Sequence, residues 1–317
     1  MKQLVTATMI ITLVLAMCSR PVLGHALNDG SKPTFGDTSK RLIVMADQSV
    51  NRVAIADVDA GSIVWEWTPT ASNVRKEDAK WFTNISDAKP VYDNKYVLTT
   101  ASAGGVALIR IADKKTVFYA YGGNGNIHSA EALPDGNIVI AASTGGYLML
   151  LKTDTTSYPF NGYTKKYNQP DAHNVVWDKK RQILWSASGN KLYQYEYNFN
   201  RAAPDLVLKD SMELPASGCH DLFPVSGSDA LWLSTSSKVW MINLQNKMVN
   251  LLSTLPRIKS VSSGSGANYP AVMVQSIDSG KQWYNDKVID FSGHTVFQLA
   301  GLKMYKARWF VPNNFSY

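Results

Sequence analysis

A segment of 24 residues recurs along the chain, and this internal repeat constrains the fold more than any other feature. The segment "HSAEALPDGNIVIAASTGGYLMLL" from His128 aligns without a gap with "HNVVWDKKRQILWSASGNKLYQYE" from His173 and with "HDLFPVSGSDALWLSTSSKVWMIN" from His220. Each copy has the pattern of an apolar strand, a turn rich in small and polar residues, and another strand. Repetition of such a unit is typical of a β-propeller.

Three further segments open in the same way, and together the copies predict a six-bladed β-propeller. They begin at Asp87, Lys259 and Lys306, and successive copies start 39 to 47 residues apart, which leaves room for four short strands. The last copy ends after one strand, whereas residues 41–67 have the later strands of a blade but no opening strand. We therefore expect the C-terminal strand to join residues 41–67 and close the ring. Seven blades are the alternative, because "KEDAKWFTNI" before Asp87 has room for another strand.

The first 24 residues predict a secretory signal peptide. Lys2 precedes an apolar run from Leu4 to Met17, and small residues follow Arg20. The run is too short for a good membrane span. "LAMC" weakly resembles a bacterial lipoprotein signal, although Met17 stands where a small residue is expected. We expect a secreted, extracellular protein with a signal peptide over residues 1–24, an N-terminal extension over 25–40 and one propeller domain over 41–317.

Charge and cysteine content limit the kinds of partner and the disulfides that we expect of the protein. Removal of the signal peptide takes away Lys2 and Arg20, which lowers the formal net charge from +7 to +5. It also takes away the other cysteine of the chain, so Cys219 is left without a disulfide partner. A mildly basic protein attracts acidic surfaces, so we expect an acidic polysaccharide or cell-wall glycan as partner. The sequence has no stripe of Lys and Arg residues interleaved with aromatic residues, so we expect no nucleic acid as partner. We expect a monomer.

The opening position of the six repeats carries most of the ionisable residues that could form a site. Because the first strand of each propeller blade lines the central channel, this position predicts a ring at one mouth, formed by Asp87, His128, His173, His220, Lys259 and Lys306. Three of the five histidines of the chain fall in it. The preceding position is mostly apolar and includes Cys219, which we expect to be an inert buried thiol. Two residues beyond the ring, Lys89 and Arg308 stand in a largely apolar layer.

This residue set favours acid–base chemistry on a carboxylate. A neutral histidine acts as a general base, while lysines and arginines neutralise the charge that develops on a bound carboxylate. The hypothesis is a polysaccharide lyase with catalytic residues His128, His173 and His220, of which His128 or His173 is the base. The substrate-binding residues would be Asp87, Lys89, Glu131, Lys259, Lys306 and Arg308, and Glu131 would also orient a histidine.

Two alternatives remain open from the sequence. The three histidines could hold a divalent metal with an open coordination position, although the neighbouring lysines would repel a cation; the lyase hypothesis itself needs no cofactor. The protein could also be a non-catalytic propeller that binds a glycan or a protein at the same mouth. Trp81 and Trp309 are the candidates for stacking on a ligand.

Several of these motifs resemble the signatures of a secreted β-propeller family of unknown function found in bacteria and in fungal and fungus-like microbes. The motifs are "HSAEALPDGNIVIAAS", "AHNVVWDKKRQILW", "GCHDLFP", "RIKSVSS", "ASAGGVALIR" and "YKARWF", and the resemblance covers about residues 40–310. The chain departs from the pattern at Cys219, where the family tends to have Gly, and at Ala46, where Glu is commoner. The resemblance implies a propeller fold and secretion but no activity. The architecture is more distantly similar to the propeller polysaccharide lyases.

Overall fold

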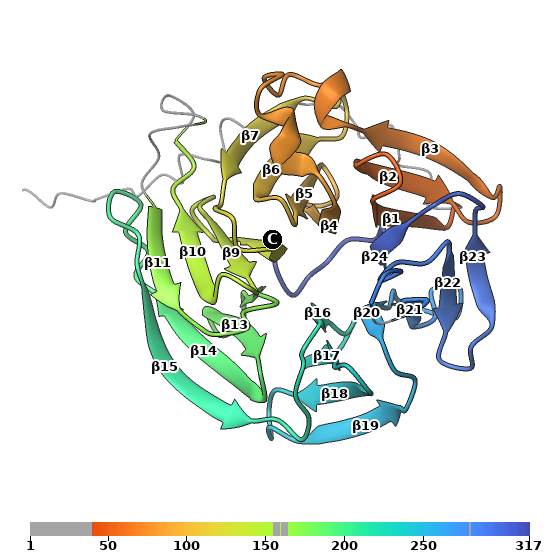
Figure 1. Ribbon diagram of the computed structural model, residues 1–317. Helices are drawn as coiled ribbons and strands as arrows, with labels where there is room; N and C mark the ends of the chain where they lie inside the picture. The colour runs from red at the N-terminus through yellow and green to blue at the C-terminus, as the bar shows by residue number, and fades with distance from the viewer. Residues whose placement is uncertain (1–39, 155–158, 160–163, 279) are drawn as a thin grey trace, which may run out of the picture. The chain divides into compact units, whose positions relative to one another are not determined.

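The computed structural model describes residues 40–317 except 155–158, 160–163 and 279. The described residues belong to one compact unit. In them, six four-stranded antiparallel sheets surround a common centre (Figure 1), and each sheet is one blade of a propeller. The expected signal peptide, residues 1–24, lies outside the described residues, as does the expected extension up to residue 39.

Each blade consists of four strands, which follow one another from the centre of the propeller outward. Blade 1 contains β24 (Met304–Trp309), β1 (Leu42–Asp47), β2 (Arg52–Asp57) and β3 (Ser62–Trp67). Blade 2 contains β4 (Ile85–Val91), β5 (Tyr96–Ala101), β6 (Gly105–Arg110) and β7 (Thr116–Tyr121). Blade 3 contains β8 (Ile127–Ala132), β9 (Ile138–Ala142), β10 (Tyr147–Leu151) and β11 (Thr164–Asn168). Blade 4 contains β12 (Val176–Asp178), β13 (Ile183–Ser188), β14 (Lys191–Tyr197) and β15 (Leu206–Glu213). Blade 5 contains β16 (Asp221–Pro224), β17 (Ala230–Ser234), β18 (Val239–Asn243) and β19 (Val249–Ser253). Blade 6 contains β20 (Ile258–Ser262), β21 (Val272–Gln275), β22 (Lys287–Asp290) and β23 (Thr295–Gln298).

The predicted closure of the ring is confirmed. The last strand, β24, runs antiparallel to β1, with Ala307 opposite Met45 and Trp309 opposite Ile43. The alternative of seven blades is wrong. The segment that had room for another strand instead forms the short 3-10 helix η2 (Ala79–Phe82), which follows η1 (Pro69–Ala71). The Phe82 side chain is fully buried and packs against Trp67 of blade 1 and Tyr119 of blade 2, so η2 contributes to the packing between these blades and adds no strand.

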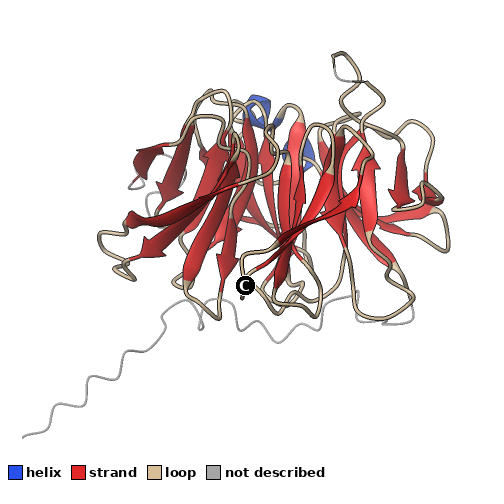
Figure 2. Cartoon of the chain, turned by 90° about the horizontal axis from the view of Figure 1, so that it is seen from below, coloured by secondary structure: helices blue, strands red, loops and turns tan. Residues whose placement is uncertain are grey.

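The two faces of the propeller differ. Figure 2 shows the blades from the side, with η1 and η2 on one face and the C-terminus at the other. We call these the helical face and the C-terminal face. The innermost strands begin near the helical face, because β4 follows η2 directly. The middle strands β5 and β9 are buried along their whole length, since a neighbouring blade packs on either side, whereas the outermost strand β15 is mostly exposed.

Packing between blades 6 and 1 depends on Trp309. Its side chain is 1% exposed, its indole N–H donates to the Pro270 carbonyl at 2.7 Å, and its ring meets Tyr269 edge-on at 5.2 Å. The expectation that Trp309 stacks on a ligand at the mouth is wrong, because this indole fills the space between two blades.

We predict that Trp309→Ala lowers the free energy of unfolding by about 3–5 kcal/mol, the usual cost of truncating a buried aromatic residue. The control is Trp283→Ala, because Trp283 is 38% exposed and its indole donates to Gln48 at the surface, and we expect it to cost clearly less than Trp309→Ala. Urea unfolding followed by circular dichroism measures both. Equal losses in the two variants would contradict the role of Trp309 in joining the blades.

Candidate functional site: a histidine cluster above buried charges

A β-bulge near the start of the innermost strands sets the register of the mouth. Strand pairing skips one residue between Ile85 and Asp87, between Ile127 and Ser129 and between Ile258 and Ser260, and likewise between Met304 and Lys306. The pairings of Ala172 with Ser188 and of Asp221 with Ser234 place His173 and His220 at the same position. The equivalent residues of blades 1 to 6 are therefore Tyr305, Ser86, His128, His173, His220 and Lys259.

The expected ring was wrong by one residue in two blades. Asp87 and Lys306 lie one position beyond Ser86 and Tyr305, at the position that Asp221 has in blade 5. With this correction the residues before the bulge are all apolar and 0% exposed: Met304, Ile85, Ile127, Ala172, Cys219 and Ile258. Cys219 is 0% exposed and burial raises the pKa of its thiol to about 12, so the expectation of a buried thiol is confirmed.

Five of the aligned side chains form what we call the mouth cluster: His128, His173, His220, Lys259 and Tyr305. The His128 and His173 rings stack with centroids 4.9 Å apart, and His173 meets His220 edge-on at 5.4 Å. On the other side of His128, the Tyr305 ring stacks at 5.3 Å. The Lys259 Nζ lies 3.3 Å from His220 Nε2 and 5.9 Å from the centre of the Tyr305 ring. The expectation that the three histidines converge is confirmed.

Burial and neighbouring charges set the protonation of the cluster. Burial lowers the pKa of His128 and His220 well below its ordinary value, and the adjacent imidazoles and lysines lower it further. The same two causes, burial first and then Lys306, lower the pKa of Lys259 to about 8. At pH 7 the cluster therefore holds neutral imidazoles at His128 and His220 beside the positive charge of Lys259.

Sequence reasoning missed Asp171, which positions His173. The Asp171 Oδ1 lies 3.0 Å from His173 Nδ1, and the Asp171 carbonyl oxygen is 3.1 Å from the same nitrogen. This geometry fits an Nδ1–H that donates to Asp171, which leaves Nε2 as the acceptor. Asp171 has a φ of +59°, a conformation that few residues other than glycine adopt. An Asp two residues before the repeated His was the one sequence signal that could have indicated this pair.

Below the mouth cluster, four side chains form what we call the axial charge network: Asp87, Asp221, Lys306 and Arg308. Each is at most 1% exposed. The Arg308 guanidinium donates to both oxygens of Asp221 at 2.8 and 2.9 Å and to Asp87 at 2.9 Å. The Lys306 ammonium lies 3.1 Å from Asp221 and donates to the His128 carbonyl at 3.0 Å. Burial alone would raise the pKa of both carboxyls, but Arg308 and Lys306 hold it below its usual range.

The axial charge network corrects three expected roles. Lys306 and Arg308 cannot bind a substrate carboxylate, because the carboxylates of Asp87 and Asp221 already neutralise them inside the protein. Asp87 is not available to a ligand for the same reason. Asp221, which sequence reasoning did not single out, contacts both cations and also accepts from the Val261 amide at 3.1 Å.

Lys89 and Glu131 form a second buried pair. The Lys89 Nζ donates to Glu131 at 2.9 Å and to the Val175 carbonyl at 2.7 Å, and both side chains are less than 5% exposed. Burial raises the pKa of Glu131 against the opposing effect of Lys89. The expectation that Glu131 orients a histidine is wrong, because Lys89 is its partner. Of the six residues expected to bind substrate, Lys259 is the one that lies in the mouth cluster.

The described residues also bear on metal binding and on Trp81. Among them, no group of three or more His, Cys, Asp and Glu side chains is arranged to hold a metal ion. The nearly parallel planes of His128 and His173, 14° apart, place the rings face to face.

Trp81 is partly buried and packs against Tyr119 and Tyr121, with ring centroids 6.1 and 5.2 Å apart.

The fold and the repeats define a six-bladed β-propeller, and comparisons place it in a family. The chain belongs to the family described as "Family of unknown function (DUF6528)", whose model matches residues 1–317. A search of the curated proteins found no match. Within the described ranges, no helix has the length and apolar character needed to span a membrane.

Solved structures similar to this one come from diverse sources. A protein of unknown function from Bacteroides caccae is 15% identical with a TM-score of 0.56, over 86% of this chain and 100% of that chain. Virginiamycin B lyase from Staphylococcus aureus is 15% identical with a TM-score of 0.50, over 80% and 79%. The β-propeller domain of Cps50 (Swd1) from Myceliophteria thermophila is 14% identical with a TM-score of 0.51, over 83% and 87%. At such identities the likeness concerns the fold.

The lowered pKa of His128 predicts a loss of stability in acid. An unfolded histidine binds a proton below about pH 6.5, whereas folded His128 binds it only at much lower pH. The unfolded chain then holds more protons, so stability is fully present above about pH 6.5 and falls as the pH decreases. We expect His128→Phe to remove up to about 2 kcal/mol of the loss measured between about pH 7.5 and about pH 5.

The control for this measurement is His294→Phe, since the His294 side chain is 82% exposed. Urea unfolding at the two pH values measures the wild type and both variants. We expect His294→Phe to keep the pH dependence of the wild type. An unchanged pH dependence in His128→Phe would contradict the buried neutral state of this histidine.

Proposed function

We propose that this protein is an extracellular lyase that acts on an acidic, uronate-containing polysaccharide at the mouth cluster. The observation that carries the proposal is the combination of adjacent imidazoles with one buried ammonium group. The ring centroids of neighbouring histidines are 4.9 and 5.4 Å apart, and the Lys259 Nζ is 3.3 Å from His220 Nε2. A base and a positive charge side by side are what removal of a proton next to a carboxylate requires.

In this proposal His173 is the base and Lys259 binds the carboxylate. Asp171 holds His173 Nδ1, so Nε2 takes the proton from the carbon that bears the carboxylate. The electron pair forms a carbon–carbon double bond, and the bond to the neighbouring glycosidic oxygen breaks. That oxygen leaves with a proton from the imidazolium or from water. His128 and His220 add no positive charge beside the base, because their lowered pKa values keep both rings neutral near pH 7.

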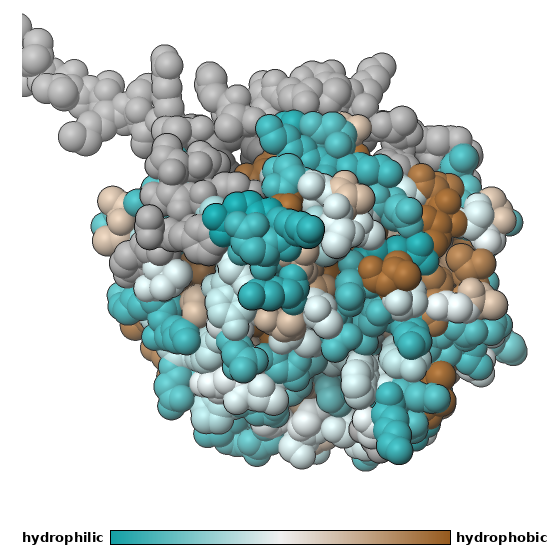
Figure 3. All heavy atoms as spheres, turned by 45° about the horizontal axis from the view of Figure 1, so that its top comes forward, coloured by the Kyte–Doolittle hydropathy of each residue, from teal (hydrophilic) through white to brown (hydrophobic). Residues whose placement is uncertain are grey.

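A second candidate function is non-catalytic binding of an acidic glycan at the same mouth. The low exposure of the cluster, 7% at His128 and 8% at Lys259, disfavours enclosure of a sugar ring among the proposed catalytic groups and so favours contact at the rim without turnover. The visible described surface in Figure 3 is mainly hydrophilic or intermediate in hydropathy, with hydrophobic residues in a few patches. Such a surface suits a polar partner better than an apolar one.

We predict that the purified protein releases unsaturated products from at least one of pectin, alginate and ulvan. Loss of the base should lower the rate by about 100-fold or more in His173→Gln, and His294→Gln is the matched control because His294 lies outside the cluster. Ultraviolet absorbance of the new double bond measures the reaction. Binding of these polymers without any turnover would favour the non-catalytic candidate instead.

We also predict that turnover falls as the pH rises above about 8, where Lys259 loses its proton. Lys259→Arg keeps a positive charge at higher pH, because arginine remains protonated. The alkaline limb of the pH–rate profile should therefore move upward in Lys259→Arg, and Lys259→Ala should lose most activity at every pH. An alkaline limb at the same pH in wild type and Lys259→Arg would exclude Lys259 as its source.

A further inference from the structure

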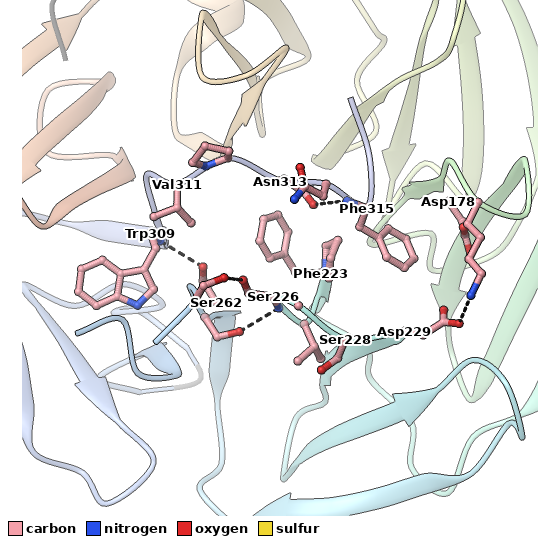
Figure 4. Close-up of a pocket in the computed structure, with 18 residues that line it drawn as sticks. Asp178, Phe223, Ser226, Ser228, Asp229, Ser262, Trp309, Val311, Asn313 and Phe315 are labelled. Carbon is pink, nitrogen blue, oxygen red and sulfur yellow. Dashed lines mark hydrogen bonds and ion pairs between the residues drawn. The ribbon is translucent and has the colours of Figure 1, made fainter. Parts of the chain in front are cut away.

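A pocket of about 290 Å³ opens on the C-terminal face, opposite the mouth cluster. Its wall on one side is the segment 311–315, which follows β24. The other walls are the turn 225–228 between β16 and β17, residues 262–265 at the end of β20, and Asp178 with Lys180 in blade 4. Figure 4 shows these elements converging on the pocket from four directions. The volume is close to the lower limit of small-molecule pockets, about 300 Å³.

The apolar part of the lining includes two aromatic side chains, Phe223 and Phe315. Phe223 lies at its base, is 8% exposed, and has the Arg308 guanidinium 4.1 Å from the centre of its ring. Because Arg308 belongs to the axial charge network, its guanidinium supports one face of the Phe223 ring. Phe315 lies on the wall formed by the C-terminal segment, and its carbonyl accepts from the Lys179 amide at 3.0 Å. The two aromatic side chains offer flat apolar surfaces to a ligand.

The polar part of the lining consists of hydroxyl groups with spare capacity to donate. The Ser263 hydroxyl oxygen accepts from the Ser226 amide and from the Trp232 indole, both at 3.2 Å. The Ser262 oxygen accepts from the Trp309 amide at 3.1 Å. In both serines the oxygen is an acceptor, so the hydroxyl hydrogen remains to donate to another group.

The charged residues of the lining are neutralised within the protein. Asp229 accepts from Arg181 at 2.6 and 2.8 Å and from Lys180 at 2.9 Å, and Asp178 accepts from Arg181 at 2.9 Å. The lining holds two acidic side chains and one basic one, and Arg181, which lies behind it, supplies the second positive charge. The pocket offers an anion or a cation no unpaired opposite charge, and this distinguishes it from the mouth cluster with Lys259.

We propose that this pocket binds one neutral sugar residue, through its apolar face against Phe223 and Phe315 and through its hydroxyl groups against the serines. A neutral monosaccharide is the ligand class that combines a small volume, a flat apolar face, many hydrogen-bonding groups and no charge. The site lies on the face opposite the mouth cluster and is independent of the proposed lyase activity.

The test is saturation-transfer NMR and calorimetry with glucose, galactose, mannose and N-acetylglucosamine, each added separately to the full chain. We expect at least one of them to bind. Since the lining has no unpaired charge, its dissociation constant should stay the same between about 50 mM and about 500 mM salt. No binding by any of the four sugars, or affinity that falls with salt, would overturn the proposal.

The variants assign the binding to this pocket. Ser228 is an exposed residue of the lining, so Ser228→Trp should fill the pocket without disturbing the core and weaken binding by about tenfold or more. The matched control is Ser211→Trp, because Ser211 is exposed on β15 and does not line the pocket. Circular dichroism and melting curves check that both variants fold. Binding that survives in folded Ser228→Trp would place the sugar elsewhere and overturn the proposal.

Discussion

The axial charge network is the interaction on which the rest of the structure depends. Arg308 in blade 1 reaches Asp87 in blade 2 and Asp221 in blade 5, and Lys306 reaches the His128 carbonyl in blade 3. Two positive and two negative charges balance in a region that excludes water, so each needs its partners: removing one partner of a buried ion pair typically costs about 3–5 kcal/mol. The network therefore helps to fix the relative positions of blades 1, 2, 3 and 5.

Both ends of the propeller draw on this network. Toward the helical face, the charge of Lys306 helps to lower the pKa of His128, His220 and Lys259. Toward the C-terminal face, the Arg308 guanidinium supports the Phe223 ring at the base of the pocket. One set of buried charges thus serves as an electrostatic floor for a charged mouth and as a packing support for a neutral pocket.

The repeat was sufficient to predict the six blades and the closing strand, because alternating strand patterns and the spacing of the copies reflect the sheets directly. The register of the innermost strands was harder. Aligning ionisable residues put Asp87 and Lys306 in the ring, whereas aligning the fully buried residues, with Ile85 and Met304 among them, gives the observed register. The bulge adds one residue to each innermost strand, and a two-residue periodicity does not reveal it.

The pairing of charges could not be predicted for a different reason. Side chains from blades far apart in the sequence meet at the axis, and whether a lysine there faces a ligand or an internal carboxylate depends on depth within the channel. Lys259 and Lys306 open similar repeats, but one lies in the mouth and the other is neutralised by Asp221. The pocket was not predicted either, because the segment 311–315 follows no repeat.

The pairing of β24 with β1 has a consequence for the way the chain is made. β1 ends at Asp47 and its partner begins at Met304, so nearly the whole chain separates the two strands. During synthesis the inner edge of β1 stays unpaired until β24 has emerged, and the axial charge network cannot form before then, because Lys306 and Arg308 belong to the same strand. The ring therefore closes, and its buried acids gain their partners, in one late event in which contacts of the longest sequence separation form together.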